Sequence, residues 1–174
     1  EIYPLLDLLA VSIASDIVPV TGENRILAYY GLKQLNENPR KGLKAIIKLS
    51  GLEHHQIAID DIVFKIGPRI NAAGRMESGK AAVDLLTSQS EEEAVDLAQA
   101  INIHNNDRKN IEGHITQEAV AMVEGNAKEF EKNVTILYNP NWHKGVIGIV
   151  ASRLIESFYK PTIVLTNSNG FITG

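Results

Sequence analysis

The stretch SEEEAVDLAQAINIHNNDRKNIEGHITQEAVAMV, residues 90–123, is the most regular pattern in the chain. Ser90 and Glu93 have the spacing of a capping box, in which the hydroxyl satisfies a first-turn N–H and the carboxylate reaches back. Behind them a stripe of side chains steps by three or four residues, as on one face of a single helix. The stripe comprises Ala94, Leu97, Ile101, His104, Arg108, Ile111, Ile115, Ala119 and Met122.

This helix is about 50 Å long at 1.5 Å per residue, so we expect it to connect two domains. His104 and Arg108 interrupt the apolar stripe, and Asn102, Asn105 and Asn106 flank them. We therefore expect the middle of the helix to be more hydrated than its ends.

The residues after the long helix alternate between strand and helix patterns. Residues 134–138 and 161–165 are predicted strands, and residues 146–158 between them are a predicted helix. The two strands are therefore expected to be parallel, joined by a right-handed crossover. Asn169-Gly170 is typical of a hairpin turn and leads into a third strand at residues 171–173.

The residues before the long helix favour shorter helices. Residues 5–18 are nearly all apolar or small and are expected to be buried on most sides. Residues 22–36 have helical spacing up to Asn38-Pro39, and residues 43–49 suggest a second helix closed by Gly51. The sequence thus predicts an α/β fold in three parts, residues 1–88, a connecting helix over 89–125, and residues 126–174.

Composition limits the kinds of site that the chain can hold. It has 174 residues, a net charge of −4 and no cysteine, so thiolate metal sites and disulfides are excluded. Any metal must be a hard cation bound by oxygen or imidazole ligands. The charge is not the basic footprint of a nucleic-acid coat protein, so any DNA contact must be local. No apolar run is long enough for a membrane span, and we expect a cytoplasmic protein.

Three segments carry residues suited to chemistry. The first is residues 12–19, where Asp16 follows an apolar element and precedes a turn. A carboxylate buried there would need a cation, a metal or strong donors, because an uncompensated charge costs several kcal/mol. The alternative is that Asp16 caps the following turn.

The second segment is residues 67–76, which we interpret as a loop. Arg69 and Arg75 bracket Asn71, and small residues around them would let a ligand approach the backbone closely. Guanidinium and amide groups suit phosphate oxygens. The alternative is an ordinary connecting loop with surface arginines.

The third segment is residues 141–154, in which a turn follows a strand and precedes a helix. His143 and Lys144 lie in that turn, and Gly145 is expected to begin the helix. Free N–H groups and the positive end of the helix dipole favour an anion there. Structural hydrogen bonding is the alternative for His143, and close packing of the helix on the sheet is the alternative for Gly148 and Ala151.

Taken together, the three segments resemble the RecJ family of DHH phosphoesterases, in the expected order and over essentially the whole chain. The first two resemble the family's fourth and fifth motifs, and the third resembles the opening motif of its second, DHHA1-type domain. The resemblance implies that residues 1–88 are the end of a DHH-type parallel α/β catalytic domain and that residues 126–174 begin a DHHA1-type domain. The resemblance implies a 5′-to-3′ exonuclease of single-stranded DNA that serves repair and recombination. It implies Mn²⁺ or Mg²⁺ as cofactor, and single-strand-binding protein or a helicase as partners.

By the same resemblance, Asp16 is the catalytic residue and metal ligand of this chain. Phosphate contacts are expected from Arg69, Asn71, Arg75, His143, Lys144, Gly145 and Arg153, in a cleft between two domains. The family's two-aspartate and Asp-His-His motifs are absent, so we expect an internal piece of a longer protein, inactive alone. Glu53-His54-His55 comes after the fourth motif and begins with Glu, so we do not assign it as that pair.

Two other functions stay open. One is a DHH-family phosphodiesterase acting on short oligonucleotides or cyclic dinucleotides, although such enzymes lack a motif like that of residues 68–75. The other is a non-catalytic DHH-like scaffold, against which the retained Asp16 argues mildly.

Overall fold

The computed structural model describes residues 2–174, apart from the side chains of residues 128 and 129. It divides into two compact units, of which unit 1 ends at Asn105 and unit 2 comprises Asn106–Gly174. Each unit is described by itself. The mixed α/β class predicted from the sequence is confirmed, with strands found only in unit 2 among the described residues.

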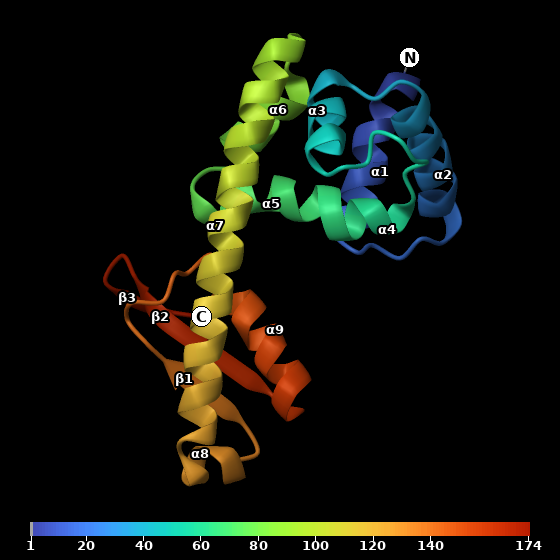
Figure 1. The fold of residues 1–174 in the computed structure, drawn as a ribbon. Helices are drawn as coiled ribbons and strands as arrows, with labels where there is room; N and C mark the ends of the chain where they lie inside the picture. Colours follow the sequence, from blue (N-terminus) through green and yellow to red (C-terminus); the bar gives the residue numbers. More distant parts are fainter. Residues whose placement is uncertain (1) are drawn as a thin grey trace. The chain divides into compact units, whose positions relative to one another are not determined.

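Unit 1 is built from helices (Figure 1). Their bounds confirm the helix predicted over residues 22–36 and the one closed by Gly51, whose φ of 70° lies in the left-handed region. The part expected to end a parallel α/β domain thus shows helices alone in the described residues. The elements are η1 (Tyr3–Leu5), α1 (Leu6–Ser15), α2 (Gly22–Glu37), α3 (Lys41–Leu49), α4 (Ile59–Asp61), the π-helical η2 (Ile62–Ile66), α5 (Gly67–Met76), α6 (Lys80–Thr87) and the start of α7 (Glu91–Glu124).

Two glycines let the helices of unit 1 approach backbone to backbone. A Cβ atom on Gly31 of α2 would overlap the carbonyl oxygen of Leu6, at the start of α1. A Cβ atom on Gly42 of α3 would overlap the carbonyl oxygen of Leu85 in α6. The packed interior beside these crossings includes Leu35, Leu43, Ile46, Ile62, Ile66 and Leu85.

A buried ion pair joins α1 to the start of α3. The Asp7 side chain is 1% exposed, and its Oδ1 accepts a 2.8 Å hydrogen bond from an Arg40 terminal nitrogen. The Arg40 guanidinium also donates to the carbonyl oxygens of Pro4 and Leu86. Arg40 therefore ties η1, α1 and α6 together.

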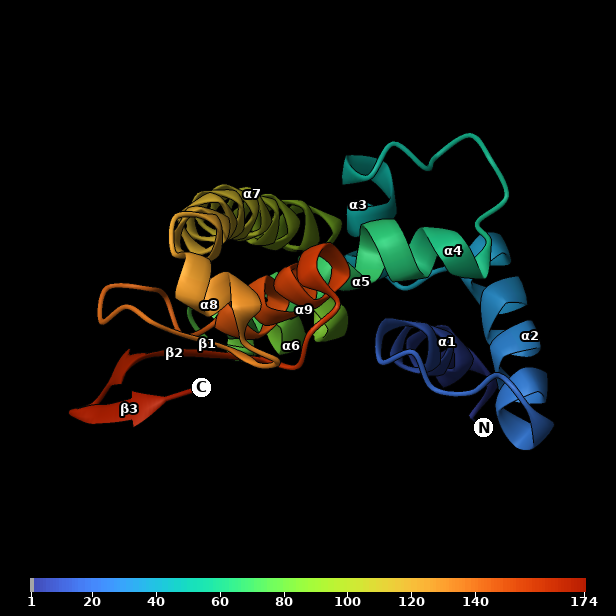
Figure 2. The ribbon, with the colours of Figure 1, turned by 90° about the horizontal axis from the view of Figure 1, so that it is seen from below.

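The prediction of a loop at residues 67–76 is wrong, because this segment is the helix α5. Figure 2 shows α4 and α5 following one another as one helical run. Pro68 lies in the first turn, where its missing N–H is not needed and its fixed φ suits a helix. Ala72 and Ala73 are buried, so the small residues serve helix packing.

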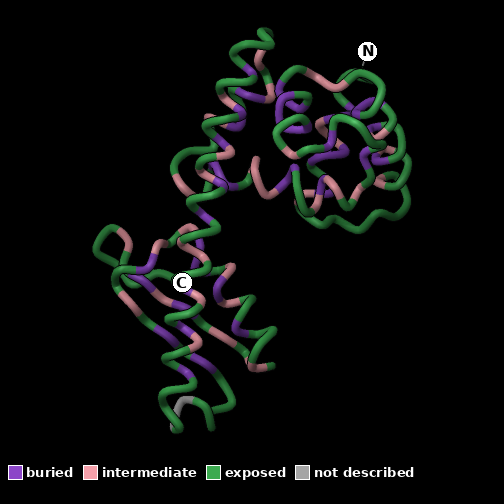
Figure 3. The backbone as a smooth tube through the Cα atoms, in the orientation of Figure 1, coloured by how far each residue is buried: buried purple, intermediate pink, exposed green. Residues whose placement is uncertain are grey.

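The long helix α7 comprises 34 residues, Glu91–Glu124. The Ser90 hydroxyl accepts the Glu93 N–H as predicted, but the Glu93 carboxylate accepts the hydroxyl of Ser88, at 2.7 Å. Buried and exposed positions alternate along the helix (Figure 3). Ala94, Ala98 and Ile101 belong to the interior of unit 1, and Ile115, Ala119 and Val123 to that of unit 2.

Two details of the α7 stripe were predicted wrongly. Met122 is 41% exposed, and Val123 beside it is fully buried in its place. The polar middle is not more hydrated throughout, because Asn105 is 1% and Arg108 is 9% exposed. A polar side chain within an apolar helical stripe can therefore be buried against other protein groups, and it does not by itself indicate contact with water.

Unit 2 is a small sheet with helices. Its elements are the end of α7, α8 (Ala127–Glu131), β1 (Thr135–Tyr138), α9 (Ile147–Phe158), β2 (Thr162–Ser168) and β3 (Phe171–Thr173). β1 pairs in parallel with β2, and β2 pairs antiparallel with β3, as predicted. Asn169 and Gly170 both have positive φ, 51° and 80°, as the tight hairpin turn requires.

Candidate active-site and strand-binding residues

Asp16 lies at the C-terminal end of α1 with its carboxylate exposed. No side-chain hydrogen bond or ion pair joins it to a described residue, so neither burial nor turn capping accounts for it. A negative charge at this end of a helix opposes the helix dipole. The next residue, Ile17, has a φ of 52° and is 79% exposed. A β-branched residue in the left-handed region is strained, and such strain concentrates at functional sites.

The end of α1 contacts the start of α5, which brings the first two motif segments together. A Cβ atom on Gly67 would lie 2.6 Å from the Ser15 hydroxyl oxygen, so only glycine leaves room for that side chain. The Ser15 hydroxyl is buried and has no hydrogen-bond partner among the described residues. Asp16 is thus held next to α5 by the packing of its neighbour.

The two arginines of α5 have different surroundings. Arg69 Nε donates to Asn102 Oδ1 of α7 at 3.1 Å, and a terminal nitrogen donates to the Lys65 carbonyl oxygen at 2.6 Å. Burial lowers the pKa of Arg69 from its ordinary value. Arg69 therefore joins two helices of unit 1, and a phosphate would compete with these bonds.

Asn71 and Arg75 lie on the exposed side of α5. They are four residues apart, so their side chains lie one above the other on the helix surface. The intervening Gly74 is also exposed. This pair, rather than the whole bracketed set predicted from the sequence, forms an accessible cationic and amide surface.

The third segment forms a turn that precedes α9. Gly145 N–H donates to His143 Nδ1 at 3.1 Å, and Val146 N–H donates to the His143 carbonyl oxygen at 3.1 Å. His143 therefore organises the turn, and α9 begins at Ile147 instead of at Gly145. Lys144 is exposed. Gly148 is exposed too, with nothing near the position of a Cβ atom, so close packing does not explain it.

Glu118 and Thr166, which the sequence did not indicate, hold this turn in place through Trp142. The buried Trp142 donates from Nε1 to Oε2 of Glu118 on α7 at 2.7 Å. Its carbonyl oxygen accepts the Thr166 hydroxyl from β2, at 2.6 Å. Each partner is 24 residues away in sequence, so no local pattern could have revealed it.

Arg153 of α9 is engaged by two carboxylates. Its Nε lies 3.4 Å from Glu112 Oε1, and a terminal nitrogen lies 3.4 Å from Glu156 Oε2. These bonds raise the pKa of Arg153 from its ordinary value, and the bond to Glu156 has the larger effect. Glu112 also accepts a 2.6 Å hydrogen bond from Arg108. A phosphate could reach Arg153 only against this local negative charge.

Asp16 alone does not make a metal site. Within residues 2–174 as described, no three His, Asp or Glu side chains are grouped as metal ligands. The Glu53-His54-His55 run is otherwise engaged, since Glu53 lies 3.9 Å from Lys48 and His55 Nε2 lies 3.1 Å from Asp61 Oδ2. A divalent cation held by Asp16 would thus need its other ligands from outside the described residues. In the same part of the chain, no helix combines the length and apolarity of a membrane span.

Relatives of known name match this chain almost from end to end. The single-stranded-DNA-specific exonuclease RecJ of Bacillus subtilis is 40% identical over 161 residues, which is 92% of this chain and 20% of that protein. The protein of the same name from Haemophilus influenzae is 37% identical over 175 residues, 98% of this chain and 30% of that one. No family model matches.

Solved structures agree with these relatives. RecJ from Thermus thermophilus, in complex with Mg²⁺, superposes with a TM-score of 0.84 at 29% identity over 94% of this chain and 25% of that chain. An exonuclease RecJ bound to manganese gives a TM-score of 0.82, also at 29% identity, over 94% of this chain and 40% of that one. The chain spans between a fifth and three tenths of the length of its curated relatives. The chain belongs to the RecJ family and corresponds to one stretch of its longer members.

Proposed function

We propose that the protein carrying this chain is a metal-dependent exonuclease that removes nucleotides from the 5′ end of single-stranded DNA. The proposal extends to this chain what the names of its relatives state of them, single-stranded-DNA specificity and exonuclease activity. The observation that carries it is Asp16, an exposed carboxylate without a partner among the described residues, placed against the helix dipole and beside the strained Ile17. Nothing in the packing of unit 1 accounts for these features.

Mn²⁺ or Mg²⁺ is the cofactor that we propose, since structures of relatives contain these ions. In such a site the ion supplies an activated water and compensates charge that develops on the phosphate. The part proposed for this chain is narrower. Asp16 contributes one oxygen ligand, and the exposed Asn71, Arg75 and Lys144 bind phosphate oxygens of the strand.

The remaining predicted phosphate contacts would have to compete with bonds inside the protein. Arg69 and Arg153 already serve bonds within their units, and His143 and Gly145 bond to one another. We further propose that the enzyme acts in the cytoplasm, on strands supplied by a helicase or coated by single-strand-binding protein.

The test is Asp16→Asn in a protein that carries this chain within the full length of its relatives. Hydrolysis of a 5′-labelled single strand should fall by about 100-fold or more, because one ligand of the cation is lost. Manganese affinity, measured by calorimetry, should fall as well. The thermal midpoint should not fall, because Asp16 is exposed, forms no hydrogen bond or ion pair with a described side chain, and carries a charge that opposes the dipole of α1. Normal turnover at limiting manganese would refute the assignment.

The matched control is Asp60→Asn, which removes another exposed carboxylate from unit 1. It should leave turnover and manganese affinity unchanged. The 174-residue chain by itself should bind manganese weakly and hydrolyse no DNA. A site of near-micromolar affinity in that chain would mean that His54, His55 or another cluster holds a metal after all.

A further inference from the structure

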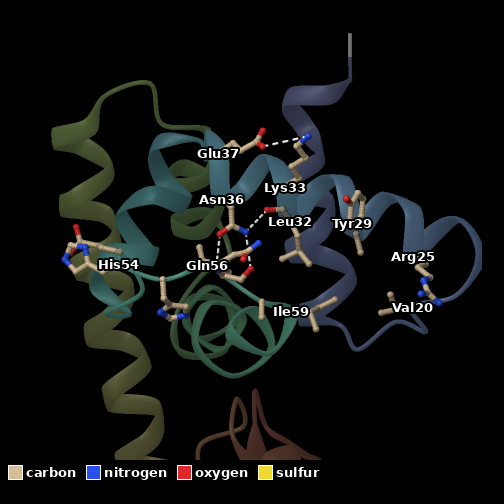
Figure 4. A pocket seen from close by; sticks show the side chains of 15 residues that line it. Val20, Arg25, Tyr29, Leu32, Lys33, Asn36, Glu37, His54, Gln56 and Ile59 are labelled. Atoms are coloured by element: carbon tan, nitrogen blue, oxygen red, sulfur yellow. Dashed lines mark hydrogen bonds and ion pairs between the residues drawn. The ribbon is translucent and has the colours of Figure 1, made fainter.

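A groove in unit 1, none of whose lining residues belongs to the three motif segments, has no part in the proposed function. It encloses about 1110 Å³ between α2 and the irregular residues 53–58. Figure 4 shows Arg25 and Tyr29 toward one end of it and His54 toward the other. The lining residues are Val20, Arg25, Ala28, Tyr29, Leu32, Lys33, Asn36, Glu37, Glu53, His54, His55, Gln56, Ile57, Ala58 and Ile59.

The wall opposite α2 is fixed by hydrogen bonds. The Asn36 side chain accepts the Ile57 N–H at 2.8 Å and donates to the Ile57 carbonyl oxygen at 3.0 Å. Beyond it, Asp61 accepts from the Ala58 N–H at 3.1 Å and lies 3.1 Å from His55 Nε2. The groove is therefore formed without a ligand, which reduces the entropy that binding must overcome.

The groove is lined by two basic residues, Arg25 and Lys33, and by two carboxylates, Glu37 and Glu53. Glu37 lies 3.9 Å from Lys33, and Glu53 lies 3.9 Å from Lys48, so each carboxylate has a cation beside it. Arg25 forms no ion pair with any residue that the structure describes. The Arg25 end of the groove is thus an accessible cation above an apolar floor that includes Ala28 and Leu32.

An exposed aromatic ring lies one helical turn from that cation. Tyr29 is 65% exposed, and its ring meets Tyr30 edge to face with centroids 5.2 Å apart. Arg25 and Tyr29 are four residues apart on α2, so their side chains are neighbours on its surface. A cation next to an exposed ring is the combination by which proteins bind a phosphate and stack its base without reading sequence.

We propose that this groove binds a segment of single-stranded DNA, with a base stacked on Tyr29 and the adjoining phosphate on Arg25. The choice of single-stranded DNA as the ligand rests on the proposed function, whereas the groove is a feature of the structure alone. It would be an additional contact with the strand, separate from Asp16 and α5. Because stacking and charge contact are both sequence-tolerant, it would bind all sequences alike.

The experiment titrates the 174-residue chain with fluorescein-labelled oligothymidylate, followed by anisotropy and by amide NMR shifts. Resonances of residues 25–36 and 53–59 should shift on binding. Tyr29→Ala should weaken binding by about tenfold or more, since one stacked base is lost, while Tyr29→Phe should bind as before. Arg25→Ala should lower the log-log salt slope by about 0.7.

Two controls lie outside the groove. Tyr159→Ala removes a ring that is 89% exposed in unit 2, and Lys80→Ala removes an exposed charge of unit 1. Tyr159→Ala should leave the affinity unchanged. In both variants the groove resonances should shift on addition of oligothymidylate as they do in the unchanged chain. Groove resonances that do not shift at any oligonucleotide concentration overturn the inference, as do unaltered affinities of Tyr29→Ala and Arg25→Ala.

The competing occupant is a peptide. If a capped pentapeptide of alternating aspartate and leucine shifts the groove resonances and oligothymidylate does not, the groove is a protein-docking site and the inference is wrong. These outcomes leave the exonuclease proposal standing, because that depends on Asp16 and on hydrolysis. Conversely, loss of the exonuclease proposal would leave a strand-binding groove intact.

Discussion

The indole nitrogen of Trp142 donates a 2.7 Å hydrogen bond to the Glu118 carboxylate, and so joins the turn before α9 to α7 within unit 2. Hydrogen bonds to a charged group contribute about 1.5–3 kcal/mol. Glu118→Ala should therefore lower the free energy of unfolding of unit 2 by about 2 kcal/mol. The chain has one tryptophan, so its fluorescence during denaturant unfolding measures this change directly.

Glu118→Gln keeps an acceptor for the indole and should lose less stability than Glu118→Ala. Glu124→Ala removes an exposed carboxylate from the same helix and should cost nothing. Equal losses in the three variants would mean that the bond to Trp142 adds no stability.

The buried pair of Asp7 and Arg40 should be the most sensitive polar contact of unit 1. Asp7→Ala leaves the guanidinium without its carboxylate and should cost about 3 kcal/mol, read from unfolding followed by circular dichroism. Arg40→Lys should lose most of this too, because an ammonium cannot also reach Pro4 and Leu86. Lys33→Ala, which breaks an exposed pair, should change stability by under about 1 kcal/mol.

Asp61 should contribute to the acid sensitivity of unit 1. Hydrogen bonds from Lys65, the Ala58 N–H and His55 lower the pKa of Asp61 well below its ordinary value. Because the pKa is lower in the folded than in the unfolded chain, the contribution is complete above about pH 4. It is lost as the pH falls below that value toward the folded-state pKa.

Asp61→Asn should therefore flatten the decline of unfolding free energy below about pH 4, measured by denaturant titrations at a series of pH values. Asp60→Asn, at the adjacent exposed position, should retain the full decline. A decline that is the same in both variants would show that Asp61 titrates alike in the folded and unfolded chain.

Strand binding should depend on Arg75 and Lys144 and little on Arg153, which is exposed but contacts two carboxylates. In the full-length protein, Arg75→Ala and Lys144→Ala should each weaken binding of every single-strand sequence alike. Each should lower the log-log salt slope by about 0.7. Arg153→Ala should change both far less, because Glu112 and Glu156 already neutralise that guanidinium.

Unchanged affinity and slope in Arg75→Ala and Lys144→Ala would place both residues outside the path of the strand. An effect of Arg153→Ala as large as theirs would instead mean that its carboxylate partners release it when DNA binds.

Sequence periodicity was enough to place α2, α3, α7, α9, β1 and β2, whereas β3, which is exposed along its length, was placed by the Asn169-Gly170 turn. It failed at α5, where glycine and proline are typical of a loop but serve here in a helix. Proline in the first turn and alanines buried against neighbouring helices settle that choice, and both depend on tertiary contacts.

The candidate site was predictable to the extent that its residues are local in sequence. Asp16 and the turn residues His143 and Lys144 were predicted from their sequence neighbours, and their roles stay predictions. The contacts of Trp142 with Glu118 and of Arg153 with Glu112 were not predictable, because they join residues 24 and 41 positions apart. The contact of Arg69 with Asn102 was likewise not predictable, because it joins residues 33 positions apart.

The crossings at Gly31 and Gly42 bear on how this protein can diverge. At each position a methyl group would overlap a carbonyl oxygen of the facing helix, so backbone touches backbone. A substitution there cannot be accommodated by a change of side-chain rotamer nearby, because the obstacle is main chain. Natural variants should therefore keep glycine at both positions for as long as the helices keep their crossing. Where one of these glycines has been replaced, the paired helices must have moved apart together, and several interior residues must have changed in the same lineage.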